Sequence, residues 1–527
     1  MSKGRILIAD KVHTICATKL REAGYEVEEM TGAKTEELAG VVGEFDGIVV
    51  RSGVKITRAA IEAMTRMKVI GRAGAGVDNI DVEAATERGI PVMNVPGGNT
   101  LSAAEHTIAM LLAAARRISA AHASLRDEKW ERSAFTGVEL FGKTVGVLGV
   151  GRIGREVAQR LRSFGTKIIG FDPFLSREAM IELGIEAGSF EEVLTGADIL
   201  TLHLPLSSET RGLIGADELS RVKPGVIIVN CARGGIIDED ALLAALIDGR
   251  VGAAAIDVFA IEPPALPSPL IDHPNVVATP HIAASTVEAQ ERVAEAIAMQ
   301  FISFLAGHDA IGLVNAGRVE GAYRQEFAHY AAAAHRLGQV MGALQKEPSA
   351  IDLTIYGEAG TSAAEGLRAA YLMGLFEGSD VSVTPVNADA IAESRGIVMS
   401  TQTASDHEAY HFLICSTQTG TEGIQTGAMT LFGEADPRLV MINDAWFEIS
   451  PEGHLLLIEH RDQPGVLAAI ATAIGERDIN ISDVSLGRRR KGTGAMTVIR
   501  TDTPCPDETL HAIRSNDVVE TLHAISL

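Results

Sequence analysis

Three side chains suited to acid–base chemistry lie near the ends of predicted strands in the middle of the chain. His281 follows the strand-like stretch 276–279, Glu262 lies in the preceding loop, and Arg233 follows the stretch 226–230. An unperturbed histidine titrates near neutral pH, and a carboxylate beside it fixes the ring and stabilises its protonated form. An arginine grips a carboxylate through two hydrogen bonds. The set therefore suits the oxidation of a hydroxy acid, in which a base takes the hydroxyl proton and a cation holds the carboxylate.

A glycine motif precedes these residues and predicts a dinucleotide site. Gly149-Val150-Gly151-Arg152-Ile153-Gly154 lies between the strand-like stretch 144–148 and a predicted helix, and the next strand ends at Asp172, close to the usual spacing of about twenty residues. The first glycines let the backbone approach a pyrophosphate, and the helix N-terminus favours its charge. Asp172 would bind the adenosine ribose and repel a 2′-phosphate, so the sequence predicts NAD rather than NADP. The alternative is a tight turn with a capping aspartate.

Each residue taken alone also has a structural interpretation. A single histidine is usually structural or solvated, Arg233 could cap a turn, and Asp257, at the end of another predicted strand, could cap a helix. Their occurrence at successive strand ends favours function, because parallel sheets bind ligands at the carboxyl ends of their strands. On this reasoning we expect Asp257 to face the nicotinamide region of the cofactor.

Alternating strands and helices position these side chains. Short apolar runs alternate with helical stretches from residue 5, and a second such series begins at Thr144. This pattern predicts parallel sheets covered by helices. A helix expected over 285–305 returns the chain toward its first region, so we predict one nucleotide-binding domain inserted into another, discontinuous domain. From Leu455 the order strand-helix-strand-strand-helix-strand is ferredoxin-like.

Length and composition bound the remaining possibilities. The 527 residues suggest three or four domains at roughly 150 residues each. A net charge of −23 argues against broad contact with nucleic acid, and no apolar run is long enough to span a bilayer. The four cysteines are not spaced as a metal site or a redox pair, so we expect no metal and a reducing compartment. The sequence predicts a soluble, cytoplasmic protein that acts on a small molecule.

Several segments resemble the D-isomer-specific 2-hydroxyacid dehydrogenases, and within them the long-form D-3-phosphoglycerate dehydrogenases. Beside the glycine motif, the likeness is carried by Gly71-Arg72-Ala73-Gly74-Ala75-Gly76-Val77-Asp78-Asn79, Asn230-Cys231-Ala232-Arg233-Gly234-Gly235, Asp257 through Glu262-Pro263-Pro264, and Pro280-His281 followed by Ala284-Ser285-Thr286. The resemblance is highly specific over 1–315 and good over 452–527. It is weaker between these ranges, where the long form carries an intervening domain.

The resemblance implies an α/β fold of four domains. A Rossmann-type nucleotide-binding domain (99–282) is inserted in a flavodoxin-like substrate domain (1–98 and 283–315). An intervening α+β domain (316–450) and a ferredoxin-like ACT domain (452–527) follow.

The resemblance also implies roles for individual residues. The catalytic residues are Arg233, Glu262 and His281. The NAD site contains Gly149, Gly151, Arg152, Ile153, Gly154, Asp172, Cys231, Asp257 and Ala75. The substrate-binding residues are Arg51, Ser52, Gly74, Asn99, Arg132 and Gln290. Ala75 is a departure from some relatives, which have Thr there, and it removes a possible hydroxyl contact to the cofactor. A surface role is the alternative for Arg51.

The implied activity is the NAD-dependent oxidation of D-3-phosphoglycerate to 3-phosphohydroxypyruvate, the first step of the phosphorylated pathway of L-serine biosynthesis. Trp130 and Arg132 resemble a segment that reaches into the neighbouring subunit, so the resemblance implies a homotetramer built as a dimer of dimers.

The last domain resembles an ACT domain, a small ligand-sensing module. Its usual turn is His460-Arg461-Asp462-Gln463-Pro464-Gly465, and the resemblance makes Asp462 and Asn480 candidates for binding L-serine as an effector. The alternative is a regulatory fold that has lost its ligand. The basic run 488–491 is expected to be a solvated loop between strands.

Two other functions remain open at this point. The substrate could be another D-2-hydroxy acid, such as glycerate, lactate or 2-hydroxyglutarate, although Arg51 and the extra domains favour a phosphorylated one. The chain could also be an NADH-sensing corepressor-type binding protein on the same fold, which the acidic charge and the ACT-like end disfavour.

Overall fold

The computed structural model describes residues 3–32, 34–308, 311–315, 325–405, 407–433, 435–488 and 494–527. The chain divides into two compact units, one spanning 1–94 and 297–527 and the other 95–296. The described residues contain four β-sheets, with five, seven, six and four strands. None of the helices in this part of the chain has the length and apolar character that crossing a bilayer requires.

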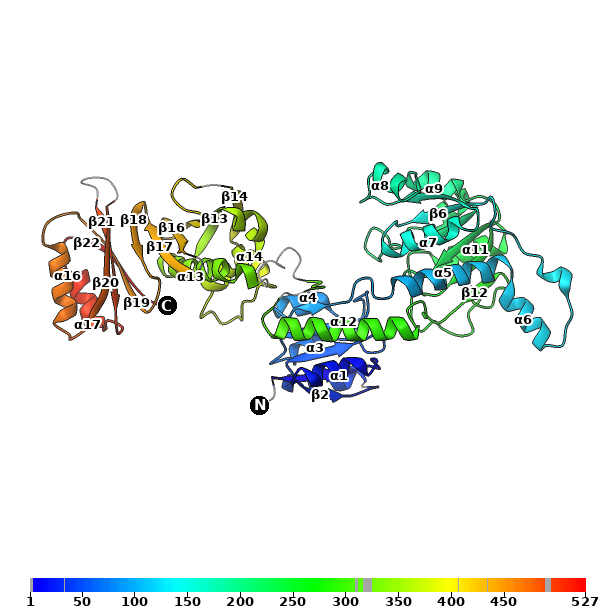
Figure 1. Ribbon diagram of the computed structural model, residues 1–527, viewed down its shortest axis with the longest axis horizontal. Coiled ribbons are helices and arrows are strands. Elements are labelled where there is room, and N and C mark those ends of the chain that lie inside the picture. Colours follow the sequence, from blue (N-terminus) through cyan, green and yellow to red (C-terminus); the bar gives the residue numbers. More distant parts are fainter. Residues whose placement is uncertain are drawn as a thin grey trace. The chain divides into compact units, whose positions relative to one another are not determined.

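The first sheet is parallel and has the strand order β2-β1-β3-β4-β5, which is flavodoxin-like. Its strands are β1 (Arg5–Ile8), β2 (Glu26–Glu29), β3 (Gly47–Val50), β4 (Val69–Arg72) and β5 (Val92–Met93). The helical segments of this region are α1 (Ile15–Glu22), α2 (Thr35–Leu38), η1 (Val42–Glu44), α3 (Arg58–Glu62), α4 (Val82–Glu87) and the end of α12 (Val287–Leu305). Figure 1 shows α1, α3, α4 and α12 around this sheet.

Two glycines let α12 pack closely on the first sheet. Phe301, on the C-terminal part of α12, is fully buried. A Cβ at Gly71 would lie 2.3 Å from the Phe301 ring, and one at Gly47 would lie 3.0 Å from it. The small residues on β3 and β4 therefore make room for the aromatic ring, and this contact returns the chain to its first sheet.

The second sheet is also parallel, with the order β12-β11-β10-β9-β6-β7-β8. This is the Rossmann order with a seventh strand, and the order reverses at β6. The strands are β6 (Thr144–Leu148), β7 (Lys167–Phe171), β8 (Glu186–Ala187), β9 (Ile199–Leu202), β10 (Val226–Asn230), β11 (Val251–Ile256) and β12 (Val276–Ala278). The helices are α5 (Thr100–Ala115), α6 (Ile118–Arg126), η2 (Arg132–Phe135), α7 (Arg152–Arg162), α8 (Arg177–Glu182), α9 (Phe190–Gly196), α10 (Ala216–Arg221) and α11 (Glu239–Ile247). Strands β9 and β10 are wholly buried, as a sheet covered on both faces requires.

The third sheet is mixed and has the order β14-β13-β15-β16-β17-β18. It contains β13 (Pro348–Tyr356), β14 (Val398–Ala404), β15 (Leu413–Gly420), β16 (Gly423–Phe432), β17 (Asp436–Ile442) and β18 (Ala445–Ile449). Its helical segments are η4 (Gln325–Phe327), α13 (Ala328–Leu344), α14 (Glu358–Leu375) and α15 (Ala388–Ser394).

The fourth sheet is antiparallel and has the order β20-β21-β19-β22, which is ferredoxin-like. Its strands are β19 (His454–His460), β20 (Ile481–Arg488), β21 (Ala495–Thr501) and β22 (Val519–Ser526), with helices α16 (Val466–Gly475) and α17 (Asp507–Arg514). The four sheets confirm the predicted fold class. The exact domain boundaries, with the intervening domain beginning at 316 in residues outside the described part, stay a prediction.

Candidate active site

The glycine turn between β6 and α7 uses each glycine differently. Gly149 has a φ of +92°, and a Cβ on it would lie 2.7 Å from the carbonyl oxygen of His203. A Cβ on Gly154 would lie 2.1 Å from the carbonyl oxygen of Gly149. A Cβ on Gly151 would meet no described atom within 4 Å. The outer glycines are therefore needed for packing, whereas Gly151 leaves open space at the N-terminus of α7, where a pyrophosphate would bind.

Asp172 follows β7 and is held beside this turn. Its Oδ2 accepts the backbone N–H of Val150 at 2.9 Å, and its Oδ1 accepts that of Phe174 at 2.9 Å. An ionised carboxylate has about four acceptor sites, so both oxygens retain the capacity to accept a ribose hydroxyl. Arg152 and Ile153 begin α7, next to this carboxylate's turn.

His281 and Glu262 form a directly hydrogen-bonded pair. Nδ1 of His281 lies 2.7 Å from Oε2 of Glu262, and both side chains are about two-fifths exposed, at 40% and 37%. Oε1 of Glu262 accepts the backbone N–H of Phe259 at 3.1 Å. Burial raises the pKa of Glu262, but the hydrogen bonds from His281 and Phe259 outweigh it and lower the pKa overall. The carboxylate is therefore ionised at neutral pH. Because it engages Nδ1, Nε2 is the ring nitrogen that can exchange a proton with a substrate.

Arg233 lies on a turn that packs against the loop carrying Glu262. Asn230 shapes this turn, because its Nδ2 donates to the carbonyl oxygen of Arg233 at 2.9 Å and its Oδ1 accepts the N–H of Ala232 at 3.1 Å. A Cβ on Gly234 would lie 1.8 Å from the carbonyl oxygen of Phe259. Only glycine fits there, so the glycine brings the arginine turn and the glutamate loop together.

A cavity of about 180 Å³ unites several predicted residues. Its lining includes Asn99, Ile153, Cys231, Arg233 and His281. Ile153, near the start of α7, and His281 thus line the same cavity. Burial raises the pKa of the Cys231 thiol to about 12, and the charge of Asp257 contributes to this rise. The thiol therefore stays protonated at neutral pH, so Cys231 lines the cavity as a neutral side chain and not as a nucleophile.

Sequence reasoning missed other residues of this lining. His203, Leu204 and Pro205 line the cavity just after β9. Burial lowers the pKa of His203 to about 4, so it is neutral, and its Nε2 lies 3.0 Å from Oγ1 of Thr201. The rule that ligands bind at the carboxyl ends of parallel strands would have pointed to this segment.

We expected Asp257 to face the nicotinamide region of the cofactor, and the structure places it in the interior. Its side chain is fully buried, and it is not among the described residues that line the cavity. The carboxylate accepts hydrogen bonds from Thr279, Ile282 and Ala283, in the loop that carries His281. Its predicted contact with the cofactor stays a prediction.

Arg51 and Ser52 follow β3 in the other unit. The backbone there is organised by Asp10, which the sequence analysis did not single out: its Oδ2 accepts the N–H groups of Arg51, Gly53 and Val54 at 3.0, 2.8 and 3.2 Å. The Arg51 guanidinium donates to the carbonyl oxygen of Lys11 at 3.2 Å, and Ser52 is exposed. The loop thus presents one cation and one hydroxyl at the carboxyl end of a strand.

Gly74 and Ala75 lie after β4 in the same unit. Gly74 has a φ of +156°, and a Cβ on it would lie 2.2 Å from Nη1 of Arg72. The carbonyl oxygen of Ala75 accepts a hydrogen bond from Nδ2 of Asn94 at 2.5 Å. These contacts define the backbone of the turn, and a role for either residue in binding stays a prediction.

Two further predicted substrate residues lie away from the cavity lining. Gln290 lies on α12, and Arg132 begins η2. Arg132 lines a separate cavity of about 350 Å³ together with Trp130, whose exposed fraction is 78%. This is the segment for which a contact with a neighbouring subunit is predicted.

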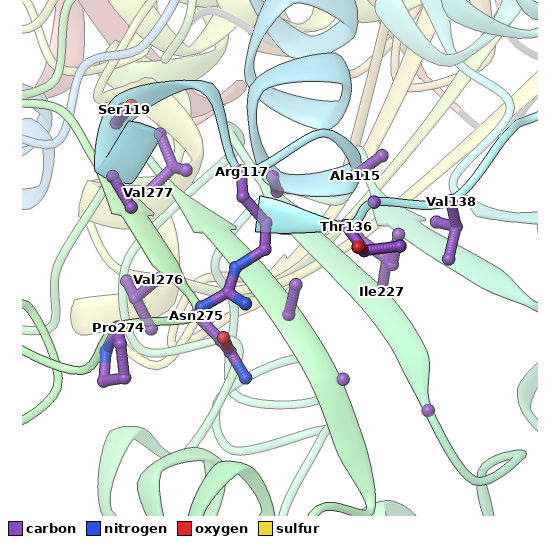
Figure 2. A pocket seen from close by; sticks show the side chains of 16 residues that line it. Ala115, Arg117, Ser119, Thr136, Val138, Ile227, Pro274, Asn275, Val276 and Val277 are labelled. Atoms are coloured by element: carbon purple, nitrogen blue, oxygen red, sulfur yellow. The ribbon is translucent and has the colours of Figure 1, made fainter. Parts of the chain in front are cut away.

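A further cavity, of about 140 Å³, lies at the opposite end of the second sheet (Figure 2). Gly225, which precedes β10, and Asn275, which precedes β12, help to line it, so it lies at the amino ends of these strands. Figure 2 shows the Arg117 side chain extending toward Asn275. The described lining residues include none of the predicted site residues.

The two candidate effector residues each have a partner within the fourth sheet's unit. Oδ2 of Asp462 lies 2.9 Å from Nε of Arg488, and Nδ2 of Asn480 donates to Oδ2 of Asp502 at 2.8 Å. An effector would have to join or replace these contacts. The rest of the basic run, 489–491, lies outside the described residues.

Comparisons with known proteins show which families the chain resembles. Three family models match: the NAD-binding domain of D-isomer specific 2-hydroxyacid dehydrogenases at 108–283, the D-3-phosphoglycerate dehydrogenase intervening domain at 326–443, and the ACT domain at 454–515. The chain is 39% identical to a D-3-phosphoglycerate dehydrogenase of Bacillus subtilis over 96% of both chains. It is 40% identical to that of Homo sapiens over 89% of both. A glyoxylate reductase structure from Paecilomyes thermophila superposes with a TM-score of 0.55 and 32% identity, covering 60% of this chain and 99% of that one.

Proposed function

Because the chain belongs to the D-3-phosphoglycerate dehydrogenase family and is an NAD-dependent dehydrogenase, we propose that it oxidises D-3-phosphoglycerate to 3-phosphohydroxypyruvate. We further propose that this is the first step of the phosphorylated pathway of L-serine biosynthesis. The observation that carries the chemistry is the 2.7 Å pairing of His281 with Glu262, at a cavity that Arg233 also lines.

The residues around the glycine turn fit the cofactor. Gly151 leaves room where a side chain would obstruct a phosphate, and the N-terminus of α7 favours its charge. Asp172 is held by two backbone N–H groups in a position suited to ribose hydroxyls. NAD, when bound, supplies the acceptor for the hydride.

The proposed acid–base step uses Nε2 of His281. This nitrogen takes the proton from the substrate's 2-hydroxyl group as the C–H bond is broken, and it returns the proton in the reverse reaction. Glu262 holds the ring through Nδ1 and stabilises the imidazolium that forms. Arg233 binds the substrate carboxylate and so places the reacting carbon.

The proposed specificity for a phosphorylated substrate rests on Arg51 and Ser52. A phosphate carries nearly two negative charges and needs several donors, and the loop after β3 supplies a guanidinium and a hydroxyl. Gly74, Asn99, Arg132 and Gln290 complete the proposed substrate set.

We also propose that L-serine is an effector at the ACT domain, through Asp462 and Asn480, and that the chain forms a dimer of dimers. The ACT-domain match supports the first proposal, since an ACT domain is a ligand-sensing module. The exposed Trp130 supports the second, because an interface with another subunit would cover it.

A turnover assay tests the function. Purified chain is mixed with NAD and D-3-phosphoglycerate, and formation of the reduced cofactor is followed by absorbance. We expect turnover that falls about 10²- to 10⁴-fold in His281→Asn, the range for loss of a general base, with NADH affinity unchanged.

Two results would contradict the proposed function and favour another one. Turnover with lactate, glycerate or 2-hydroxyglutarate but not with D-3-phosphoglycerate would identify a dehydrogenase of another D-2-hydroxy acid. NADH binding without turnover on any of these substrates would identify a cofactor-sensing binding protein.

A further inference from the structure

The backbone of His281 adopts a conformation that is unfavourable for a residue with a side chain. Its φ is +52°, in the left-handed region, directly after Pro280. Such a conformation persists only where the surrounding contacts impose it. The direction of the His281 side chain therefore depends on whatever holds this loop.

The carboxylate of Asp257 holds the loop on both sides of His281. Its Oδ1 accepts the hydroxyl of Thr279 at 2.6 Å and the N–H of Ile282 at 2.9 Å, and its Oδ2 accepts the N–H of Ala283 at 3.0 Å. The N–H of His281 donates to the carbonyl oxygen of Asp257 at 2.8 Å. One fully buried residue thus holds four residues of the loop, Thr279, His281, Ile282 and Ala283.

His106, on α5, holds the carboxylate in turn. Its Nε2 lies 3.2 Å from Oδ1 of Asp257 and 3.3 Å from Oγ1 of Thr279, and its side chain is 18% exposed. A buried carboxylate is unfavourable unless it is paired and hydrogen-bonded. Burial raises the pKa of Asp257, but the hydrogen bonds from His106, Thr279 and the loop N–H groups outweigh it and lower the pKa. His106 therefore helps to keep the acceptor of the loop ionised.

We propose that His106 is a positioning residue for the acid–base step, acting through Asp257 and Thr279 on the loop that carries His281. The inference rests on the proposed function, in which His281 exchanges the substrate proton. Without the donor on α5, the buried carboxylate keeps only the donors of the loop itself, so the strained loop shifts with it and the imidazole loses its alignment with Glu262. The effect falls on kcat, because His106 reaches the reaction only through the loop.

Three substitutions separate positioning from bulk packing. His106→Gln places an amide N–H close to the position of Nε2, His106→Asn is too short to reach Asp257, and His106→Leu has no donor. We expect kcat to fall about tenfold to a hundredfold in the Asn and Leu variants, the loss that a displacement of about 1 Å causes. The Gln variant should restore kcat to near the wild-type value. NADH affinity, measured by fluorescence titration, should change much less than kcat in all three variants.

Two results of the same measurements would contradict the role of His106. Equal kcat in the Gln and Asn variants would overturn the proposal, even if the Leu variant failed to fold. A parallel fall of kcat, NADH affinity and melting temperature would also overturn it, because a purely structural residue gives that pattern. A wild-type chain with no turnover on any 2-hydroxy acid would instead refute the proposed function, and this inference with it.

Discussion

At the residue scale, the local contacts of three carboxylates separate their roles. Asp172 accepts backbone N–H groups beside the glycine turn, and Glu262 pairs with the imidazole of His281. Asp257 is buried directly after β11 and accepts hydrogen bonds from the loop after β12. Burial raises the pKa of Glu262 and of Asp257, but in each case the hydrogen bonds lower the pKa by more than burial raises it. Both are therefore ionised at neutral pH, so both oxygens of each carboxylate act as hydrogen-bond acceptors.

Asp172 should set the choice of cofactor. In Asp172→Ala the ribose loses hydrogen bonds to a charged group, each of which contributes about 1.5–3 kcal/mol, so KM for NAD should rise roughly tenfold or more. KM for NADP should fall, since the repulsion of its 2′-phosphate is removed. Steady-state kinetics with both cofactors measures the ratio, and an unchanged ratio would contradict the role of Asp172.

Arg51 should set the preference for a phosphorylated substrate. In Arg51→Ala, kcat/KM for D-3-phosphoglycerate should fall about tenfold to a hundredfold, the loss expected for one charge-assisted contact. Turnover of D-glycerate should change little. Arg58→Ala is the matched control, because Arg58 is an exposed arginine of the same unit that pairs with Glu87 and should have no kinetic effect. Equal losses on both substrates would refute the phosphate role.

At the element scale, the strand–turn–helix unit of β6 and α7 joins packing to binding. Val145, Val147 and Leu148 of the strand are fully buried, and Val157 and Leu161 of the helix are fully buried as well. The close packing of turn and helix at Gly154 leaves no room for a methyl group, whereas the surface at Gly151 is open. One short motif therefore contains both a glycine required for packing and a glycine that leaves room for the proposed phosphate contact.

This difference predicts opposite phenotypes for two alanine variants. Gly154→Ala should destabilise the chain by about 1–3 kcal/mol, because the added Cβ would overlap the carbonyl group of Gly149. Gly151→Ala should leave stability within about 0.5 kcal/mol, since its φ of −72° suits alanine, but NADH affinity should fall. Thermal unfolding without ligand and NADH titration distinguish the two. A Gly151→Ala chain with normal NADH affinity would show that the phosphate does not bind there.

At the scale of the whole molecule, the candidate catalytic residues and the candidate effector residues lie with different sheets. The paired histidine and glutamate, the arginine and the glycine turn all lie on loops that follow strands of the seven-stranded sheet. The candidate effector residues belong to the four-stranded sheet, more than 180 residues further along the chain than His281. Two exposed apolar side chains, Leu125 at the end of α6 and Trp130 just after it, line one cavity.

Subunit association should depend on Trp130. An exposed fraction of 78% is unfavourable for so large an aromatic side chain unless another surface covers it. Trp130→Ala should weaken the dimer by about 2 kcal/mol or more, roughly a thirtyfold rise in Kd. Sedimentation velocity over a range of concentrations measures this, with Ile247→Ala, an exposed apolar residue of α11, as the control. A Trp130→Ala chain that associates like the wild type would place the subunit contact elsewhere.

Serine regulation should be detectable as binding. Titration calorimetry of the full chain should show heat on addition of L-serine, and Asp462→Ala should weaken the binding at least tenfold, because a charged contact of about 1.5–3 kcal/mol is lost. D-serine is the control for stereospecific recognition. No heat with the wild-type chain would rule out the effector role.

Much of the molecule could be predicted from local sequence. The glycine motif at 149–154, the aspartate at the end of the next strand and the alternating pattern predicted an NAD-binding Rossmann-type domain, and the fold, the family and the cofactor are confirmed. The reason is that these features depend on short-range properties: the backbone freedom of glycine, the charge at a helix N-terminus and the burial of apolar strands. The proposed roles of the individual site residues still await experiment.

What only the tertiary structure decided is how residues distant in sequence share one task. His106 and Asp257 are 151 positions apart, and no local pattern links them, yet they meet at 3.2 Å beneath the loop of His281. The placement of Asp257 in the interior, away from the cavity lining, and the presence of His203 in that lining have the same origin. Contacts of this kind arise when parallel strands align their carboxyl ends and a helix packs across them, because the relative placement of whole elements depends on the entire core.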